Sequence, residues 1–266
     1  MKIILSRKGF DSANGGCASP IIDDRFLSLP IPSHDTARFA DLSFEGRSYP
    51  DLLRTWNKKN PEAKYFCNSC GVPLEGCHVD PDLENGWFGQ IGSAQGYLRN
   101  NGVGPGDIFL FFGRFQCADE AAWKRDGELR PEKDAPVIHA IYGWLEVGKV
   151  LECPARAEEI RQLYSGHPHA SEARLADKSN ALYVAEPGRF GVFKFDEELV
   201  LTLNPGKESK TATWDMNRFS YLKVNGRNNQ SNIPGELYYR GIWQELVLDS
   251  GDAEKRALDL IKKPTR

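Results

Sequence analysis

The chain has 266 residues, of which 40% are hydrophobic and 27% are charged, the composition of an ordinary globular protein rather than of a disordered one. It carries 34 Lys and Arg against 37 Asp and Glu, a net charge of -3, which excludes a strongly basic coat for nucleic acid but not a local basic groove. Its 25 glycines and 16 prolines indicate many turns and short elements, and they argue against a helical bundle.

The sequence contains no apolar run of about 18 residues, so we expect no transmembrane helix and no membrane partner. The first twelve residues hold one short apolar stretch followed by charge, unlike a signal peptide. We therefore expect a cytoplasmic protein whose six cysteines are reduced, metal-bound or buried rather than paired in disulfides.

The predicted elements are short and of mixed type. Apolar runs and alternation predict strands, in chain order, at 2–5, 25–32, 108–112, 137–150, 181–184, 190–195, 199–203 and 244–248. Helical periodicity predicts helices that begin near 48–51 and that cover 93–101, 155–164 and 252–262. The polar stretch 57–77 is expected to be a loop insertion, and 116–136 a long hairpin excursion. The pattern predicts an α+β fold, mainly antiparallel with a few peripheral helices, in a single compact domain over 1–266.

The first candidate site is the polar loop that follows the first predicted strand. This loop carries two cations, an acid, a hydroxyl and two glycines: Arg7, Lys8, Asp11, Ser12, Gly15 and Gly16. The cations can hold a phosphate, and glycines let backbone N–H groups approach a ligand closely. The loop matches neither the P-loop nor the dinucleotide fingerprint, and the alternative is a solvated loop with a tight glycine turn.

The second candidate is the run His78-Val79-Asp80-Pro81-Asp82. Pro81 holds the chain extended, so Asp80 and Asp82 are expected to project to the same side. An imidazole beside two carboxylates can share acid–base work or bind a divalent metal, and mostly hard oxygen ligands favour Mg²⁺ or Mn²⁺. The alternative is an Asp-Pro turn capped by its own side chains.

The cysteines near this run offer a competing metal site. Cys67 and Cys70 have the spacing of half a zinc site, which Cys77 or His78 would complete. The spacing is not an established zinc pattern, so we favour reduced cysteines over structural zinc.

Further candidates lie in the second half of the chain. His167 and His169, locked by Pro168, can face one ligand, or they form an exposed helix-to-loop junction. The aromatic strands around 106–115 and 139–150 are expected to be mostly core, with some side chains lining a cavity in which a base stacks. The ligand-binding candidates from these strands are Arg114, Tyr142 and Trp144.

Two resemblances follow from these motifs. Gly106-Asp107 with the run 141–147 resembles PUA-like barrels of the EVE and ASCH kind, which implies a barrel core over 87–203. A broader resemblance, to the third nucleotide-modification-associated domain family of bacteria and phages, rests on runs across the chain: 6–12 with Gly15-Gly16, 78–83, 112–115, 142–145, Arg240-Gly241 and Gln244-Glu245. It implies association with modification of nucleotides or DNA bases, or with defence against phage, and protein partners from such an operon. It supplies no known reaction.

Two functions are consistent with these observations. In the first, the protein is an enzyme that acts on a nucleotide or nucleic-acid base: Arg7 and Lys8 hold phosphate or developing negative charge, and the acid–base or metal groups are Asp11, His78, Asp80, Asp82 and Glu245. In the second, it is a non-catalytic reader of modified bases through an aromatic pocket. We favour the enzyme, because the polar candidates span several elements and combine both signs of charge with imidazole.

Contact with a nucleic-acid polymer would need a local basic patch. One candidate patch lies in the 116–136 excursion and the other in a glycine- and asparagine-rich stretch: Lys124, Arg125, Arg130 and Lys133, and Arg218, Lys223 and Arg227. With so few cations, we expect weak binding to unmodified duplex.

Overall fold

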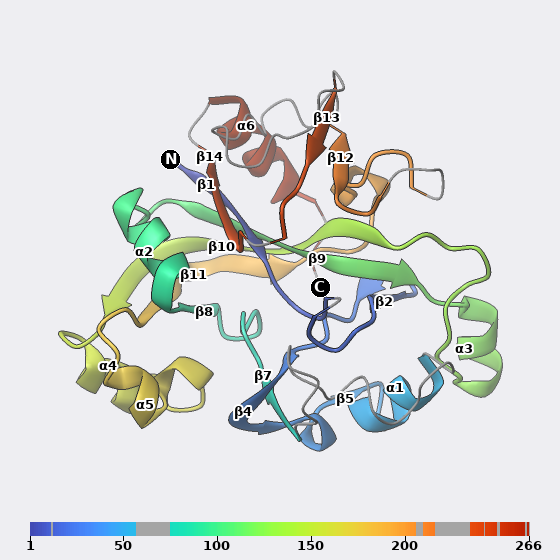
Figure 1. Cartoon of the computed structure of the whole chain (residues 1–266), viewed down its shortest axis with the longest axis horizontal. Coiled ribbons are helices and arrows are strands. Elements are labelled where there is room, and N and C mark those ends of the chain that lie inside the picture. Colours follow the sequence, from blue (N-terminus) through green and yellow to red (C-terminus); the bar gives the residue numbers. More distant parts are fainter. Residues whose placement is uncertain are drawn as a thin grey trace.

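The computed structural model describes residues 1–11, 13–56, 75–205, 210–215, 235–241, 243–248, 251–263 and 265. Its centre is an eight-stranded sheet (Figure 1). The main path of this sheet runs in the order β14 (Glu245–Leu248), β1 (Ile3–Arg7), β9 (Ile108–Cys117), β10 (Ile138–Glu152), β11 (Ala181–Val192) and β8 (Trp87–Gln90). The remaining two strands are β2 (Ser19–Ile22), which pairs with β9, and β3 (Arg25–Phe26).

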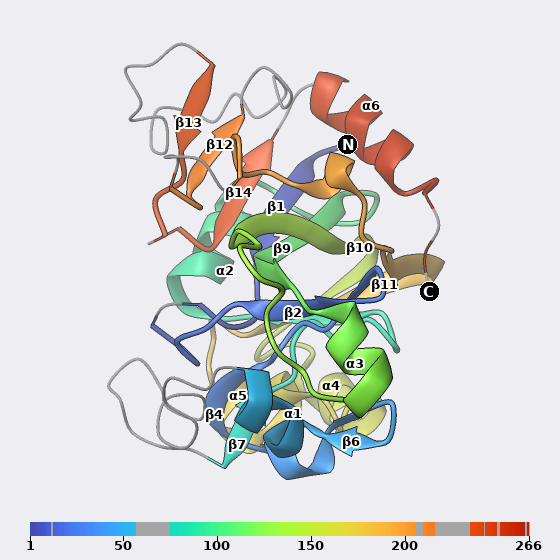
Figure 2. The same cartoon turned by 90° about the vertical axis from the view of Figure 1, so that its right-hand side faces the viewer.

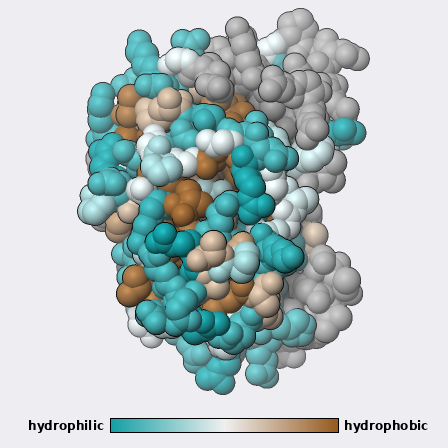
Figure 3. Space-filling model, turned by 90° about the vertical axis from the view of Figure 1, so that its left-hand side faces the viewer, coloured by the Kyte–Doolittle hydropathy of each residue, from teal (hydrophilic) through white to brown (hydrophobic). Residues whose placement is uncertain are grey.

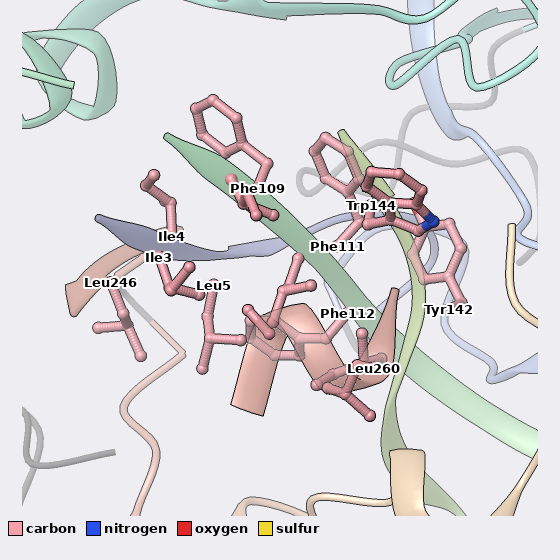
Figure 4. Close-up of a cluster of buried hydrophobic side chains, with 14 of the residues drawn as sticks. Ile3, Ile4, Leu5, Phe109, Phe111, Phe112, Tyr142, Trp144, Leu246 and Leu260 are labelled. Atoms are coloured by element: carbon pink, nitrogen blue, oxygen red, sulfur yellow. The ribbon is translucent and has the colours of Figure 1, made fainter. Parts of the chain in front are cut away.

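Most neighbouring strands are antiparallel, but β1 and β2 run parallel to β9. Both faces of the central strands are covered, so β1 is apolar on both sides: Ile3 and Leu5 lie on one face and Ile4 on the other (Figure 4). Burial on both faces explains the continuous apolar runs that predict β1 and β9. The expected α+β class is confirmed.

The sheet curls until its two edge strands meet. Gln90 on β8 donates through Nε2 to Oε1 of Glu245 on β14 at 2.6 Å, although four strands separate them along the sheet. Phe88 of β8 also contacts the rings of Phe109 and Phe111 on β9. These residues therefore line the inside of a half-barrel.

Helices and small sheets surround the half-barrel (Figures 1 and 2). The helix α6 (Gly251–Leu260) packs against the large core cluster, and α2 (Gly92–Asn100) contacts β14. A second hydrophobic cluster involves α1 (Tyr49–Trp56), α3 (Glu120–Asp126), η1 (Phe39–Asp41) and the short strands β4 (Ile31–Arg38), β5 (Ser43–Phe44) and β7 (Gly76–His78). The strand β6 (Arg47–Ser48) pairs with β5. A third involves α4 (Ala157–Leu163), η2 (Pro168–Ala170) and α5 (Glu172–Leu175). The other elements are η3 (Glu197–Leu199), β12 (Thr213–Asp215) and β13 (Glu236–Tyr238).

Several element predictions need correction. The predicted strand 25–32 is divided between β3 and β4, and the predicted strands 181–184 and 190–195 overlap one long strand, β11. The 116–136 excursion contains a helix, α3, and 199–203 holds the end of η3 and isolated bridges instead of a regular strand. Of the predicted insertion 57–77, residues 57–74 lie outside the described residues and Gly76-Cys77 belong to β7.

The expected PUA-like region 87–203 supplies β8 to β11, but it does not make the sheet alone. The strands β1 and β14, which lie outside that range, complete the curled sheet. The face on the left of Figure 1, which carries α2 and α4, is mainly hydrophilic with small hydrophobic areas (Figure 3). No helix in the described part of the chain combines the length and the hydropathy needed to cross a bilayer.

Candidate active site

A largely buried lysine, Lys8, with 10% of its side chain exposed, lies between two buried carboxylates just after the end of β1. Ser6 and Lys8 point to the same face because side chains alternate along a strand, and Glu245 lies directly opposite Ser6 on β14. Nζ of Lys8 lies 3.6 Å from Oε1 of Glu245 and 3.9 Å from Oδ2 of Asp80. The same ammonium lies 4.3 Å from the centroid of the Phe88 ring. The curl of the sheet thus brings together charges from three distant segments.

Glu245 is held at only one of its oxygens. Its Oε1 accepts hydrogen bonds from Ser6 Oγ at 3.0 Å and Gln90 Nε2 at 2.6 Å. Its Oε2 is buried and has no hydrogen-bond partner among the described residues. Burial raises the pKa of Glu245 above its ordinary value, against the opposing effect of the Lys8 charge. This carboxyl therefore keeps its proton to a higher pH than an exposed glutamate does.

Asp80 is the opposite case. Its Oδ1 accepts a hydrogen bond from the backbone N–H of Gly89 at 2.8 Å and lies 3.2 Å from His167 Nε2. Burial by itself would raise the pKa of Asp80, but hydrogen bonds from His167 and His78 and the charge of Lys8 hold it well below its ordinary range. One carboxyl of the pair thus favours its proton and the other its charge, an arrangement that separates acid and base roles.

His78 bridges two aspartates. Its Nδ1 lies 2.8 Å from Oδ2 of Asp35, on β4, and its Nε2 lies 3.7 Å from Oδ2 of Asp80. Burial would lower the pKa of His78, but the hydrogen bonds to Asp35 and Asp80 raise it above the ordinary value. Burial likewise works to raise the pKa of Asp35, and the bonds from His78 and Ser33 bring it down to about 2.

His169 lies against the backbone of β8. A Cβ on Gly89 would come within 2.2 Å of the His169 ring, so this close approach requires glycine. Nδ1 of His169 lies 2.6 Å from Asn180 Oδ1, and Nε2 lies 3.3 Å from Arg174 Nη1. Burial lowers the pKa of His169 to about 3, so this imidazole is neutral.

Two clefts flank the buried ions. The first, of about 580 Å³, is lined by Glu245, Arg7 and residues of α2. The second, of about 730 Å³, is lined by Asp80 and by aromatic side chains that include Tyr49 and Tyr142. Because Lys8 contacts both Glu245 and Asp80, it connects the walls of the two clefts.

The loop predicted to bind a ligand, residues 6–16, forms most of its polar contacts within the loop. Asp11 Oδ1 accepts from the backbone N–H groups of Ala13 and Asn14, both at 2.7 Å, and Oδ2 lies 3.4 Å from Nη1 of Arg7. Gly15 has a positive φ of 80°, and a Cβ there would come within 2.3 Å of the buried Phe10 ring.

Within the same loop, the N–H of Gly16 donates to the carbonyl of Asp11. The glycines thus serve the turn itself, and Ser12 lies outside the described residues.

Asp82 does not join Asp80. Its Oδ1 accepts from the N–H groups of Glu84 and Asn85, both at 3.1 Å, and its Oδ2 accepts from the Asn85 side chain. His169, rather than Asp82, lies close to His78 and Asp80. Each of these three residues has one potential metal-ligand atom within 4.8 Å of those of the other two. The expectation that Asp80 and Asp82 form one hard-oxygen site is therefore not supported by their placement.

The other candidates lie away from this group or in the core. Tyr142 and Trp144 are buried, 3% and 5% exposed, and Arg189 lies over the Trp144 ring. Arg114 is half-buried on β9. Cys77 belongs to the second hydrophobic cluster, where burial raises its pKa to about 12, and Cys67 and Cys70 lie outside the described residues.

Six side chains or backbone positions of the site escaped the sequence prediction: Ser6, Asp35, Gly89, Gln90, Arg174 and Asn180. Ser6 had a usable signal, because it directly follows the predicted strand 2–5 and an extended continuation of that strand places it on the same face as Lys8. The others come from short or irregular segments whose contacts depend on the curl of the sheet.

The fold and site define an α+β protein with a cluster of buried titratable side chains between two clefts. The family model described as nucleotide modification associated domain 3 matches residues 2–249, so the chain belongs to that family. The family associates the chain with nucleotide or DNA modification. No curated protein and no solved structure matches it.

Proposed function

We propose that this protein is an enzyme that acts on a nucleotide or a nucleic-acid base, with Lys8 and Glu245 as its acid–base pair. The observation that carries the proposal is Oε2 of Glu245, which is buried, has no hydrogen-bond partner among the described residues, and belongs to a residue that lines the Arg7 cleft beside the largely buried Lys8. A buried ion group with an unsatisfied oxygen costs folding free energy, so its presence in a cleft indicates function. The proposed setting is DNA modification or phage defence in the cytoplasm, with partner proteins of the same system.

The same cleft offers a place for phosphate. Ser93 and Ala94, in the first turn of α2, line it together with Arg7. The N-cap residue Ile91 makes no side-chain cap bond and the N–H of Gly92 donates to Ser179 Oγ at 2.9 Å, but the next N–H groups of a first turn still favour an anion. A guanidinium beside such a turn suits a nucleotide phosphate, and Glu245 in the same wall then faces the bound molecule.

The pKa of Glu245 determines its chemical role. A carboxyl whose pKa is raised by burial holds a proton that it can donate to a base nitrogen or to a leaving oxygen. The carboxylate left behind would be stabilised by the Lys8 ammonium 3.6 Å away. The pair is therefore suited to general acid catalysis followed by return of the proton.

The test uses mononucleotides, nucleoside triphosphates, and single- and double-stranded oligonucleotides. Binding is measured by calorimetry, and conversion by mass spectrometry of the recovered ligand. Glu245→Gln should bind a ligand with near-normal affinity but convert it at least about 100-fold more slowly, the usual cost of losing a general acid. Lys8→Met should weaken both steps. Glu254→Gln, a matched change at a partly exposed position of α6, should do neither.

The reader of modified bases is the second candidate, favoured by the aromatic wall of the second cleft, which includes Phe26, Tyr49, Tyr142 and Phe190. A reader would return its ligand unchanged, and Glu245→Gln would leave affinity and ligand intact. That outcome, or conversion that survives Glu245→Gln, would overturn the enzyme proposal.

A further inference from the structure

Three side chains of the types that bind metals lie close together, and Asp80 is one of them. They come from the last residue of β7, the turn after it, and η2: His78, Asp80 and His169. One ligand atom from each lies within 4.8 Å of the other two. Two imidazoles and one carboxylate are the donors of open transition-metal sites, in which water or substrate takes the remaining positions.

The contact of His78 with Asp35 leaves its second nitrogen facing Asp80. Nδ1 lies 2.8 Å from Oδ2 of Asp35, an acceptor, so Nδ1 carries a proton. Nε2 lies 3.7 Å from Oδ2 of Asp80, and a metal ion bound there would take the place of the proton that lies between these two atoms when the ring is charged. An imidazole whose second nitrogen donates to a carboxylate is the usual arrangement of a metal-bound histidine.

The same argument fixes His169. The Nδ2 group of Asn180 donates to the carbonyl of His169 at 3.0 Å, which orients the amide so that Oδ1 faces Nδ1 of the ring at 2.6 Å. Nδ1 therefore carries the proton and Nε2 the lone pair. The Nδ1 atoms of His78 and His169 thus donate to separate partners, Asp35 and Asn180, which leaves Nε2 of each ring to coordinate a metal ion.

His167 has the opposite tautomer and a different task. Its Nδ1 accepts the backbone N–H of His169 at 3.2 Å, so its Nε2 carries the proton toward Oδ1 of Asp80, 3.2 Å away. Together with the N–H of Gly89, His167 occupies Oδ1 and leaves Oδ2 facing His78. His167 therefore positions the carboxylate and is not a ligand.

We propose that Nε2 of His78, Nε2 of His169 and Oδ2 of Asp80 bind one divalent transition-metal ion of the Zn²⁺ or Fe²⁺ class. The nitrogen donors favour these ions over Mg²⁺. Metal–nitrogen bonds of about 2.0–2.1 Å require the three donors to move closer together when the ion binds. Because Asp80 also lines the second cleft, the open positions of the ion are accessible to a ligand there.

Two cations compete with the metal for these atoms. Arg174 Nη1 lies 3.3 Å from Nε2 of His169, and Lys8 Nζ lies 3.9 Å from Oδ2 of Asp80. Arg174 is partly exposed, with 24% of its side chain accessible, and Nη2 lies 3.5 Å from Asp35 Oδ1. Metal binding must displace Arg174 from His169, so Arg174→Met should tighten metal binding.

The test measures metal on the full chain without a nucleotide, so its failure leaves the Lys8–Glu245 proposal standing. Chelator-treated protein is titrated with Zn²⁺, Co²⁺ and Mg²⁺, desalted, and analysed for metal content. We expect one Zn²⁺ or Co²⁺ per chain, visible Co²⁺ bands typical of nitrogen and oxygen ligands, and no retained Mg²⁺. The Co²⁺ spectrum of the wild-type protein reports the ligands directly and depends on no variant.

Variants then assign the ligands. His78→Ala and His169→Gln should lose the ion, and Asp35→Asn, which removes the charged acceptor of the His78 ring without removing a ligand, should weaken its binding about 10-fold to 100-fold. His34→Ala, an exposed histidine on the same strand as Asp35, is the control and should bind normally. Near-ultraviolet circular dichroism checks that each variant is folded.

Three results would overturn the proposal: a wild-type protein without Zn²⁺ or Co²⁺ after desalting, metal that survives both histidine changes, or thiolate bands in the Co²⁺ spectrum that disappear in Cys67→Ser.

Discussion

At the scale of single residues, the site depends on two carboxyl groups in similar burial but opposite electrostatic surroundings. Asp80 accepts a hydrogen bond from the Gly89 backbone and lies 3.2 Å from His167 Nε2, whereas Glu245 has one oxygen without a partner among the described residues. Lys8 contacts both. The difference in hydrogen bonding, not in burial, therefore separates the pKa values of the two groups.

The raised pKa of Glu245 predicts a pH dependence of stability. An acid whose pKa is higher in the folded than in the unfolded chain binds more protons when folded, so stability falls as the pH rises through the interval above 4.5. A tenfold difference in proton affinity between the two states corresponds to about 1.4 kcal/mol. Between pH 4 and pH 8, the melting temperature of the wild-type protein should therefore decline relative to that of Glu245→Gln. A difference that stays constant over this range would show that the pKa is not raised.

Gly89 predicts a localised packing defect. In Gly89→Ala the new Cβ would meet the buried His169 ring at 2.2 Å, so the ring or the strand must shift. We expect a loss of about 1–3 kcal/mol in the free energy of unfolding, the cost of overpacking. Gly104→Ala, where a Cβ meets nothing within 4 Å, should change stability by less than about 0.5 kcal/mol. Equal effects in urea denaturation would contradict the close contact.

At the scale of elements, the helix α3 gives the 116–136 excursion a defined structure. Asp119 caps it: Oδ1 accepts from the N–H of Ala122 at 2.9 Å, and Oδ2 pairs with Arg130. The helix ends at Gly127, whose φ is 62°. A polar and charged excursion thus holds a short capped helix that packs Trp123 into the second hydrophobic cluster.

Loss of this cap should destabilise the protein modestly. Asp119→Ala should lower the free energy of unfolding by about 1 kcal/mol, with at most a small addition from the exposed ion pair to Arg130. Asp126→Ala, at the other end of α3 and paired only with its exposed neighbour Arg125 among the described residues, should stay within about 0.5 kcal/mol of the wild type. Thermal or urea unfolding of the two variants checks the difference, and the reverse order would show that the cap does not stabilise α3.

At the scale of the whole molecule, the charges argue for weak contact with nucleic-acid polymers. Of the first predicted basic patch, Lys124 pairs with Asp23 and Glu120, and Arg125 and Arg130 pair with neighbouring aspartates. The second patch, 218–227, lies outside the described residues. With a net charge of -3, little uncompensated positive charge is left for phosphates.

A salt titration tests this expectation. Binding of a labelled unmodified duplex should be weak, and the slope of log K against log salt should correspond to about two to four phosphate contacts. A free nucleotide measured in parallel should show much less salt dependence. A steep slope, like that of dedicated repressors, would reveal a basic surface larger than the described ion pairs leave available.

The local sequence pattern alone predicts the strands that are buried on both faces and the helices that are amphipathic. The apolar runs of β1, β9 and β10 and the periodicity of α2 and α6 predict these elements, because burial of one strand or one helix face follows from its own residues. Three of the predicted catalytic residues, Lys8, Asp80 and Glu245, also lie together in the structure. The sequence indicated Lys8 and Glu245 because they are charged residues next to or within predicted strands, and Asp80 because it belongs to the motif 78–82.

Only the tertiary structure decided what those residues contact. Ser6 and Gln90 reach Glu245 across 239 and 155 positions of the chain, and Gly89 supports both Asp80 and His169 through its backbone. Asp11 and Asp82 carry the same chemistry as Asp80 in sequence, yet each caps its own turn. The sequence determines which chemical groups are available. The order of the strands and the curl that joins β8 to β14 determine which of these groups come into contact. Neither the strand order nor the curl is encoded in a local run of residues, so local patterns could not predict these contacts.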